Sequence, residues 1–409
     1  MKILLLSTFG NYGGAAVCAI RLLKALKKHD VDAELRVLMA YDNQAAKPIL
    51  YASFINRARI FLDFALDRLK VLFRISDRKY LYKFSTGQAG INLVNNRHVI
   101  QADIIHLHWV GFSFTSIRTI QLLSKLKPVI WTFHDMWAFT GGCHYSSDCI
   151  NFKKVCDDCF YLKDSSLSKK IQEEKLRGWS RDQFKILTTS NWLAEEARSS
   201  RIFDKWEVNV LPTPIDTRVF YPLIKDELRI RYKLADSDYY VLFGAVDLKD
   251  ERKGFKLLLE AFNILNNRIP NLHLITFGKG DAKIDRYKVT SFGSVSSHKK
   301  LNEIYNLSDI FVLPSIQDNL PNTVMEALSC GVPVVSFNSG GVVDMVEHKQ
   351  NGYIVDTYNV EELVAGIMYF LSEEIRRRAG VEARKKIDEH FSEGRLIPEY
   401  ISLYQSAIE

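Results

Sequence analysis

Short apolar runs recur along the whole chain, separated by segments whose apolar residues have helical spacing. In the first half the runs KILLLS, AELRVLM, ADIIHLHW and PVIWTFH predict strands, and VCAIRLLKALKKH between the first two predicts an amphipathic helix. Runs with little polar alternation are typical of strands buried on both faces of a parallel sheet. Strands that alternate with helices predict an α/β fold.

A second series of the same kind follows in the other half of the chain. It comprises the strands YYVLFGAV, LHLITFG, IFVLP and PVVSF and the helices FKLLLEAFNIL, KKLNEIYNL and NTVMEALSCG. The stretch from IFVLP to PVVSF predicts a right-handed βαβ unit. Its loop QDNLPN therefore lies at the carboxyl end of a sheet, where open α/β folds bind ligands.

The length of 409 residues suits two domains, and three prolines in LPTPIDTRVFYP mark the link between them. We predict an N-terminal Rossmann-like domain over 1–210 and a second one over 211–385, facing each other across a cleft. A C-terminal helix over 386–409 is expected to pack back on the first domain.

Composition narrows the class of protein. Hydrophobic residues make up 47% and charged residues 25%, and the net charge is +7, which is typical of a globular protein and does not indicate a nucleic-acid binder. No apolar run approaches the ~20 residues needed to span a bilayer. The start MKILLLSTFGNYGG predicts a first strand instead of a signal peptide. We expect a cytoplasmic protein, soluble or peripheral on the inner face of the cell membrane.

Two carboxylates, Asp318 and Glu326, flank the predicted strand-to-helix corner. Free N–H groups at a helix N-terminus attract phosphate, and a carboxylate one turn along can accept paired ribose hydroxyls. The pair therefore predicts a site for a nucleoside diphosphate. The alternative is that Glu326 only complements the helix dipole.

Several motifs together resemble the GT-B-fold glycosyltransferases of family 4, which are mostly retaining. These are EALSCGVPVV with Gly340-Gly341 after it, ERKGFKLLLEAF, SDIFVLPS, TSNWLAE and the Gly13-Gly14 turn. The block WTFHDMWAFTGGCHYSSDCINFKKVCDDC resembles a subgroup of colanic-acid and surface-polysaccharide transferases. The resemblance implies metal-independent transfer of a hexose from a UDP- or GDP-sugar to a glycan or an undecaprenyl-type lipid-linked acceptor, in exopolysaccharide, capsule or O-antigen assembly.

The resemblance also assigns roles to single residues. Glu326 matches the second acid of the family's E-x7-E motif, which binds the donor ribose, and Asp318 stands at the first acid. Because Asp is one methylene shorter than the usual Glu, this departure could change donor preference. Lys253 matches the lysine that contacts the donor diphosphate. A frequent family Arg is replaced by Asp247, so Arg252 is the candidate for the second cation.

His134, in TFHD, matches a family histidine near the donor sugar and the reacting centre. A neutral imidazole there could hydrogen-bond a sugar hydroxyl, or its backbone carbonyl could stabilise an oxocarbenium ion. A single histidine is otherwise more often structural. His106 and His108 alternate along one strand, so both face the same way, toward an acceptor or into packing.

The candidate sites are therefore two sets. The catalytic set is His134, Lys253, Asp318 and Glu326; the donor-binding set is Gly13, Gly14, Arg252, Lys253, Gly278, Phe292, Gly293, Asn319, Leu320, Asn322, Thr323 and Glu326.

Four cysteines, Cys143, Cys149, Cys156 and Cys159, form a C-x5-C-x6-C-x2-C cluster in the loop 143–159. In a reducing cytoplasm such a cluster suggests structural zinc first. A reduced, redox-sensitive loop and disulfides are the alternatives.

The segment 55–84 is rich in aromatic residues, with eight basic and three acidic side chains. Phe61, Ala65, Leu69 and Leu72 recur at helical spacing, with basic residues between them. An apolar face with basic flanks predicts a helix at an anionic membrane surface. The alternative is an ordinary amphipathic helix packed on its own domain.

Other functions are less well supported. The nearest enzyme alternative is a GT-B nucleotide-sugar epimerase, and a different class is a non-catalytic sugar-nucleotide binder. A dinucleotide-dependent oxidoreductase would need a GxGxxG turn, which neither half has. No nucleic-acid-binding motif is present.

Overall fold

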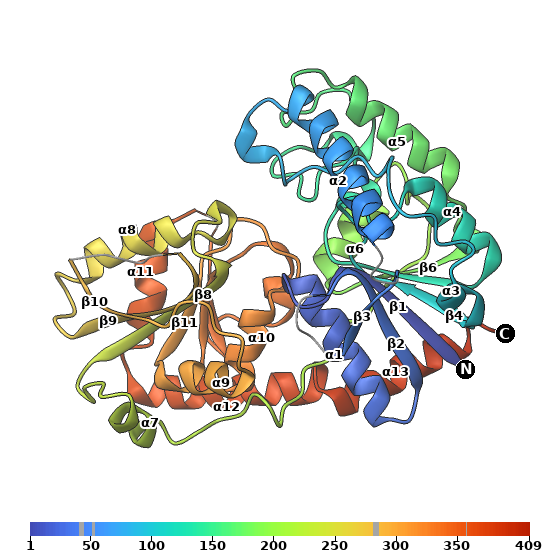
Figure 1. Cartoon of the computed structure of the whole chain (residues 1–409). Helices are drawn as coiled ribbons and strands as arrows, with labels where there is room; N and C mark the ends of the chain where they lie inside the picture. The colour runs from blue at the N-terminus through green and yellow to red at the C-terminus, as the bar shows by residue number, and fades with distance from the viewer. Residues whose placement is uncertain (41–44, 51–53, 281–285, 357) are drawn as a thin grey trace. The chain divides into compact units, whose positions relative to one another are not determined.

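The computed structural model describes residues 1–40, 45–50, 54–280, 286–356 and 358–409, without the side chains of residues 54–57 and 59. The chain forms two compact units, shown in Figure 1. Unit 1 contains Met1–Pro214 together with Ile397–Glu409, and unit 2 contains Ile215–Leu396. Both termini therefore belong to unit 1.

Unit 1 is built on a parallel sheet with the strand order β3-β2-β1-β4-β5-β6-β7. The strands are β1 (Lys2–Phe9), β2 (Asp32–Met39), β3 (Ala46–Pro48), β4 (Ile104–Leu107), β5 (Val129–Phe133), β6 (Phe184–Thr188) and β7 (Val208–Val210). The helices are α1 (Gly14–Lys28), α2 (Phe54–Arg74), α3 (Arg97–Gln101), α4 (Ile117–Leu126), α5 (Ser166–Gly178) and α6 (Asn191–Arg198).

Unit 2 is built on a second parallel sheet, in the order β10-β9-β8-β11-β12-β13. Its strands are β8 (Tyr239–Asp247), β9 (Leu272–Lys279), β10 (Lys288–Ser291), β11 (Ile310–Leu313), β12 (Val334–Phe337) and β13 (Gly352–Val355). Its helices are α7 (Lys225–Arg231), α8 (Phe255–Leu265), α9 (His298–Leu307), α10 (Asn322–Ser329), α11 (Val360–Tyr369) and α12 (Glu373–His390). The next helix, α13 (Glu393–Gln405), begins in unit 2 and belongs to unit 1 from Ile397 onward. Two parallel α/β sheets confirm the predicted fold class.

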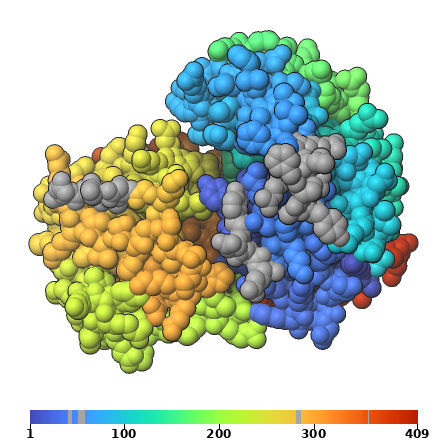
Figure 2. All heavy atoms as spheres, viewed as in Figure 1, coloured from blue at the N-terminus to red at the C-terminus, as the bar shows by residue number. Residues whose placement is uncertain are grey.

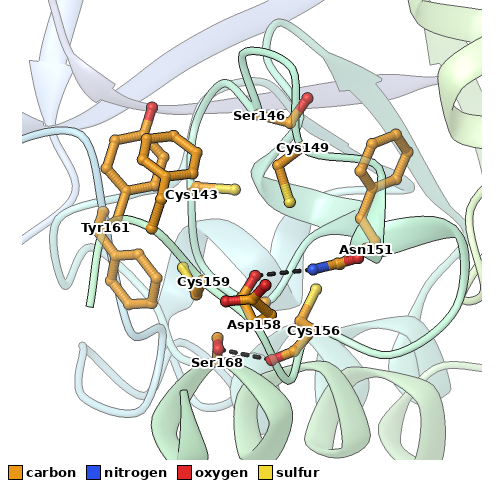
Figure 3. A pocket seen from close by; sticks show the side chains of 13 residues that line it. Cys143, Ser146, Cys149, Asn151, Cys156, Asp158, Cys159, Tyr161 and Ser168 are labelled. Carbon is orange, nitrogen blue, oxygen red and sulfur yellow. Dashed lines mark hydrogen bonds between the residues drawn. The ribbon is translucent and has the colours of Figure 1, made fainter. Parts of the chain in front are cut away.

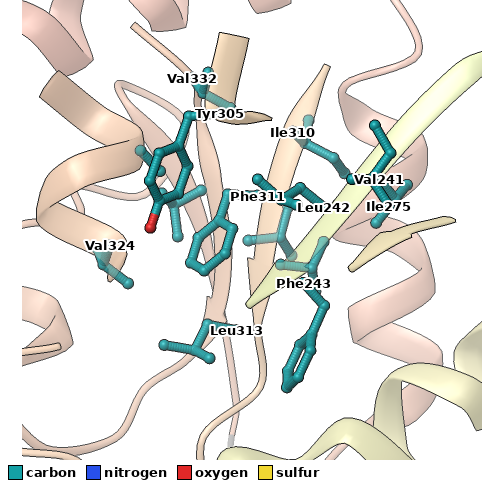
Figure 4. Close-up of a cluster of buried hydrophobic side chains, with 14 of the residues drawn as sticks. Val241, Leu242, Phe243, Ile275, Tyr305, Ile310, Phe311, Leu313, Val324 and Val332 are labelled. Atoms are coloured by element: carbon teal, nitrogen blue, oxygen red, sulfur yellow. The ribbon is translucent and has the colours of Figure 1, made fainter. Parts of the chain in front are cut away.

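Each sheet has its own hydrophobic core. In unit 2 the central strands β8 and β11 contribute Leu242, Phe243 and Phe311, and α9 adds Tyr305, all fully buried (Figure 4). Every residue of β11 is buried, which explains why the run IFVL lacks the polar alternation of a half-exposed strand.

Both sheets have a point at which the direction of strand succession reverses. In unit 2 the chain proceeds from β8 outward to β9 and β10, and then returns to β11 on the other side of β8. The loops after β8 and β11 therefore lead away to opposite faces of the sheet. Such a reversal opens a crevice at the carboxyl ends of the two strands. In unit 1 the reversal lies between β1 and β4.

A buried ion cluster fixes the first helix of unit 2 to the sheet. The Asp309 carboxylate accepts from Arg229 at 2.8 Å and Lys225 at 3.0 Å, both on α7, and from the backbone N–H of Tyr240 at 2.8 Å. Burial would raise the pKa of Asp309, but the two cations hold it below its usual value.

The last residues of the chain belong to unit 1 and bury two of their tyrosine side chains there. Tyr400 and Tyr404 of α13 are fully buried. The Tyr404 hydroxyl is hydrogen-bonded to His106 Nδ1 at 2.7 Å, and the Tyr400 hydroxyl donates to the carbonyl of Leu211 at 3.2 Å. In the part of the chain that the structure describes, no helix is both long and apolar enough to cross a bilayer.

Candidate functional site

Two loops meet at the reversal point of unit 2 and bring three predicted residues into contact. A 3-10 turn after β8 carries Arg252 and Lys253, and the loop after β11 carries Asp318. The Lys253 ammonium donates to one carboxylate oxygen of Asp318, and Arg252 Nη1 lies 3.2 Å from the other. Arg252 also donates to the carbonyl of Gln317 at 2.8 Å. Two cations therefore flank one carboxylate at the sheet edge where ligands bind.

Two glycines allow these loops to approach so closely. Gly254 has φ +73°, and a Cβ there would lie 1.9 Å from the carbonyl oxygen of Pro314. Gly340 has φ +57°, and its Cβ would lie 1.7 Å from the carbonyl oxygen of Asp318. Only glycine adopts both this backbone and this proximity without strain. The sequences ERKGF and Gly340-Gly341 therefore hold the Asp318 loop from two sides.

Burial and the neighbouring charges have opposite effects on the pKa values of Asp318 and Lys253. Burial by itself would raise the pKa of Asp318, but Lys253 and Arg252 lower it below its usual value. Burial lowers the pKa of Lys253, and Asp318 only partly restores it. Asp250 also lies 3.2 Å from Arg252, so two carboxylates, Asp318 and Asp250, pair with the two cations of the cluster.

Glu326 lies in the fifth position of α10 and is buried. Its Oε2 accepts a hydrogen bond of 2.7 Å from the hydroxyl of Tyr305 on α9. The fifth position lies beyond the first turn of the helix. A carboxylate complements the helix dipole best within that first turn. Tyr305 is a contact that sequence reasoning missed, because its pattern only indicated a core position of a helix.

The remaining donor-site candidates of unit 2 lie on two segments. Asn319, Leu320, Asn322 and Thr323 connect Asp318 to the first turn of α10, and Asn319 is buried. Gly278 follows the last core residues of β9, and its N–H donates to the carbonyl of Gly293 at 2.8 Å.

Two further residues beside these segments have defined contacts. Phe292 packs edge-on against Tyr232, with ring centroids 5.7 Å apart. Asp247, at the place of the frequent family Arg, accepts from the N–H of Lys249 at 2.8 Å and so fixes the turn before Arg252.

The other candidates belong to unit 1. Gly13 precedes α1 with φ +85°, and no atom lies within 4 Å of a Cβ built there, so its backbone conformation alone calls for glycine. Gly14 is the first residue of α1. His134 follows β5, and its Nε2 lies 2.9 Å from Nδ1 of His108, which follows β4.

A buried network that the sequence did not predict follows His134. Asp135 accepts from Trp109 Nε1 at 2.5 Å, from His144 Nδ1 at 2.7 Å and from the N–H of Trp137 at 2.9 Å. His144 Nε2 lies 2.9 Å from the hydroxyl of Ser85. This is a Ser–His–Asp arrangement, but Ser85 is only 1% exposed, so no substrate reaches it. The network instead fixes the loop after β5.

The four clustered cysteines are free thiols that line one small cavity of about 20 Å³, room for about one water molecule (Figure 3). Burial raises the pKa of Cys156 to about 12 and that of Cys143 well above its usual value. At neutral pH both are therefore thiols instead of thiolates.

The prediction of structural zinc is not supported. Four thiolates are a donor set that zinc uses, but no three His, Cys, Asp or Glu side chains of the described residues are placed to hold one ion. Protein groups already hold the loop. Ser168 donates to the carbonyl of Cys156 at 2.7 Å, and Gln172 accepts from the Cys156 N–H at 2.9 Å. The buried Lys175 ammonium donates to the carbonyl of Thr140 at 3.1 Å.

Helix α2 has five of its apolar side chains on the outside, and the segment near residue 70 forms part of the surface in Figure 2. Phe61, Leu62, Leu66, Leu69 and Phe73 are between 47% and 72% exposed; we call them the α2 apolar face.

The inner side of α2 is partly charged. It carries the buried ion pair of Asp67 and Arg68, next to Val71. Of the four predicted residues, Phe61 and Leu69 face outward and Ala65 and Leu72 are half-buried. Because Val71 lies in the hydrophobic core, α2 also packs on its own unit, as the alternative proposed. The side chains of Arg57 and Arg59 lie outside the described residues.

Comparisons with known proteins agree with this architecture. The family described as Glycosyltransferase Family 4 matches residues 12–219, and the family described as Glycosyl transferases group 1 matches residues 225–387. The first match alone covers half of the chain.

Proteins with similar sequences also have names that describe glycosyltransferases. WcaC of Escherichia coli K12, whose name describes a glycosyl transferase of colanic acid biosynthesis, is 24% identical over 82% of this chain and 83% of its own length. An uncharacterized glycosyltransferase of Haemophilus influenzae is 35% identical, over only 28% of this chain and 35% of its own.

Solved structures with low identity share the fold. The Anabaena protein HepE in complex with UDP-glucose has a TM-score of 0.67 at 14% identity, covering 99% of this chain and 100% of its own. Sucrose-phosphate synthase from Thermosynechococcus elongatus has a TM-score of 0.68 at 16% identity, covering 99% and 98% of the two chains. With both sheets and both halves of the sequence matched, the chain belongs to glycosyltransferase family 4 and has the two Rossmann-like domains of GT-B glycosyltransferases.

Proposed function

We propose that the protein is a retaining glycosyltransferase that moves a hexose from a UDP- or GDP-sugar to a glycan or a lipid-linked glycan acceptor in surface polysaccharide biosynthesis. The observation that carries the donor site is the contact of Arg252 and Lys253 with Asp318 at the reversal point of unit 2. The name of WcaC supports the polysaccharide, and the UDP-glucose complex of HepE supports the donor.

The chemistry follows from where charge develops. When the bond between the anomeric carbon and the phosphate oxygen breaks, negative charge gathers on the departing diphosphate. Lys253, Arg252 and backbone N–H groups at the start of α10 are the donors proposed to stabilise it. We propose that Glu326 accepts hydrogen bonds from the ribose and that His134 of unit 1 contacts the reacting sugar.

Retention requires the acceptor to bond on the face that the diphosphate leaves. We propose that the acceptor hydroxyl passes its proton to the departing phosphate oxygen as the new glycosidic bond forms. Two protein cations at the diphosphate make a catalytic metal unnecessary in this proposal, so transfer should persist in a chelator.

A thermal-shift screen of UDP, GDP, ADP and their sugars tests the donor site. One ligand family should stabilise the wild type, by about 2.7 kcal/mol at a concentration 100 times its dissociation constant. Lys253→Ala and Glu326→Ala should lose most of that nucleotide-dependent shift.

Matched controls separate binding from general loss of charge. Lys249→Ala removes an exposed lysine from the same loop, and Glu361→Ala removes an exposed acid from the first turn of α11. Both should keep the full shift. If no nucleotide stabilises the wild type, or the four variants respond equally, the donor-site proposal is wrong.

We further propose that the α2 apolar face contacts an anionic membrane surface, which would bring the enzyme to a lipid-linked acceptor on the inner face of the cell membrane. Five exposed apolar side chains on one helix form a patch that water solvates poorly. Exposed Lys70 and Arg74 on the same helix and Arg78 and Lys79 after it would attract anionic lipid.

Liposome flotation tests this surface. The wild type should float with anionic vesicles at low salt and less at high salt, because screening weakens the attraction. Each of Phe61→Ser and Phe73→Ser should weaken binding about 10-fold, in line with the loss of ~1.5 kcal/mol of apolar burial. Ile230→Ser, at a 77% exposed position on α7, is the control and should bind normally. No binding by the wild type, or equal loss in the control, contradicts the proposal.

A further inference from the structure

The imidazoles of His108 and His134 share one hydrogen bond at the carboxyl ends of β4 and β5. Their bonded nitrogens, Nδ1 of His108 and Nε2 of His134, are 2.9 Å apart. The ring centroids are 5.2 Å apart and the planes are inclined by 24°. This separation is what an in-line bond between two nearly coplanar rings requires, so the rings meet edge to edge and not face to face.

Both rings are neutral at physiological pH. Burial lowers the pKa of His134 to about 4 and that of His108 well below its usual value. Two neutral imidazoles have one proton between the two bonded nitrogens. Either His108 donates to His134 or His134 donates to His108, and the choice fixes the tautomer of both rings.

The second ring nitrogen of His108, Nε2, decides between these two arrangements. Its Nε2 is buried and has no hydrogen-bond partner among the described residues. A buried N–H group without an acceptor is rarer and costlier than an unused lone pair. The Nε2 of His108 is therefore the bare nitrogen, and its proton is on Nδ1, from which it donates to His134.

We infer that His108 is a positioning residue that holds His134 in the neutral tautomer with its proton on Nδ1. The lone pair of His134 Nε2 is then occupied by the bond from His108. The remaining nitrogen of His134 is an N–H donor, so its ring donates a hydrogen bond and does not accept a proton. This inference rests on the proposed role of His134 at the reacting sugar, and it assigns that role as hydrogen-bond donor instead of general base.

Two neighbouring groups, His106 and Asp135, are compatible with this assignment. His106, whose ring centroid is 4.5 Å from that of His108, is satisfied by Thr132 and Tyr404 on its two nitrogens. Asp135 favours a protonated His134, but burial outweighs it.

Long-range ¹H–¹⁵N spectra of the full chain with ¹⁵N-labelled histidine test the inference without an activity assay. The chain has ten histidines, and His108→Asn and His134→Asn assign the two signals. At pH 7 both residues should show a protonated Nδ1 and a bare Nε2. A His134 ring that is protonated on Nε2, or on both nitrogens, overturns the inference.

Two variants show whether His108 is the cause. His108→Phe keeps a ring but removes the donor, so His134 should lose its single tautomer, whereas the amide of His108→Asn can replace the Nδ1–H and should preserve it. If His134 keeps its tautomer in His108→Phe, His108 does not position it. The wild-type spectrum remains decisive if a variant fails to fold. A nucleotide screen with no stabilising ligand would reject the donor site and leave these spectra unaffected.

Discussion

Asp318 is one of two positions, with Asp247, at which this chain departs from the pattern of its family. A glutamate at this position would reach one methylene further, whereas Asp318 contacts both Lys253 and Arg252. The carboxylate therefore neutralises part of the charge that a diphosphate would otherwise meet.

We predict that Asp318→Asn binds UDP or GDP more tightly than the wild type does, by up to about 10-fold or ~1.4 kcal/mol. The substitution removes a negative charge that competes with the diphosphate for the same two cations. Isothermal titration calorimetry measures the change. Weaker binding would show that Asp318 arranges the cations for the ligand, and Asp388→Asn, in an exposed helix pair, should leave affinity unchanged.

The cysteine cluster leads to a second prediction about single residues. Because burial raises the pKa of Cys143 and Cys156, little reactive thiolate forms at pH 8. Iodoacetamide labelling followed by mass spectrometry should show both residues modified far more slowly in the native protein than in urea. Rapid native labelling of Cys156, or one equivalent of zinc in chelator-free protein, would contradict this account of the loop.

At the scale of elements, apolar runs predicted most of the buried strands, whereas the long helices α5 and α12, whose sequences are mostly polar, were not predicted. The strands β1, β8 and β11 and helix α2 gave clear patterns, but β3 and β7 have three residues each, too few for a period to appear. For α2 the helical period predicted an apolar face but did not determine whether that face is buried or exposed. Which face is exposed depends on the buried Asp67–Arg68 pair, a contact the pattern did not show.

We predict that Asp309→Asn loosens α7 from the sheet of unit 2 and lowers the free energy of unfolding by about 3–5 kcal/mol at pH 7, because Arg229 is left as a buried, poorly paired charge. Urea denaturation followed by circular dichroism measures the loss. Asp388→Asn, which removes a surface pair within α12, should cost at most about 0.5 kcal/mol.

The same ion cluster has a defined pH dependence. The folded pKa of Asp309 lies below its usual value, so its stabilisation is fully present above about pH 4 and is lost as the pH falls through the folded pKa. The difference in stability between wild type and Asp309→Asn should therefore shrink below pH ~4. A constant difference down to pH 2 would show that Asp309 acts by packing and not by charge.

At the scale of the whole molecule, the chain completes unit 1 with its last residues, Ile397–Glu409. All six tryptophans lie within residues 109–206 and therefore in unit 1. Tryptophan fluorescence thus reports the unfolding of unit 1 alone, and circular dichroism reports both units.

We predict that Tyr404→Phe destabilises unit 1 by about 1–3 kcal/mol, because the buried His106 loses the hydroxyl at its Nδ1. The fluorescence transition in urea should shift to lower concentration. Tyr82→Phe, at a 61% exposed position, serves as the control and should leave the transition in place. An unchanged transition in Tyr404→Phe would mean that His106 finds another partner.

The sequence by itself determined the α/β class, the two series of strands, the family and the segments that carry Lys253, Asp318 and Glu326. These features depend on local periodicity and on motifs a few residues long, which a single sequence contains. The tertiary structure decided which groups meet: Asp318 with two cations, Glu326 with Tyr305, and His108 with His134. Each partner lies on a different element, so only the strand order and the crossovers between strands bring them together.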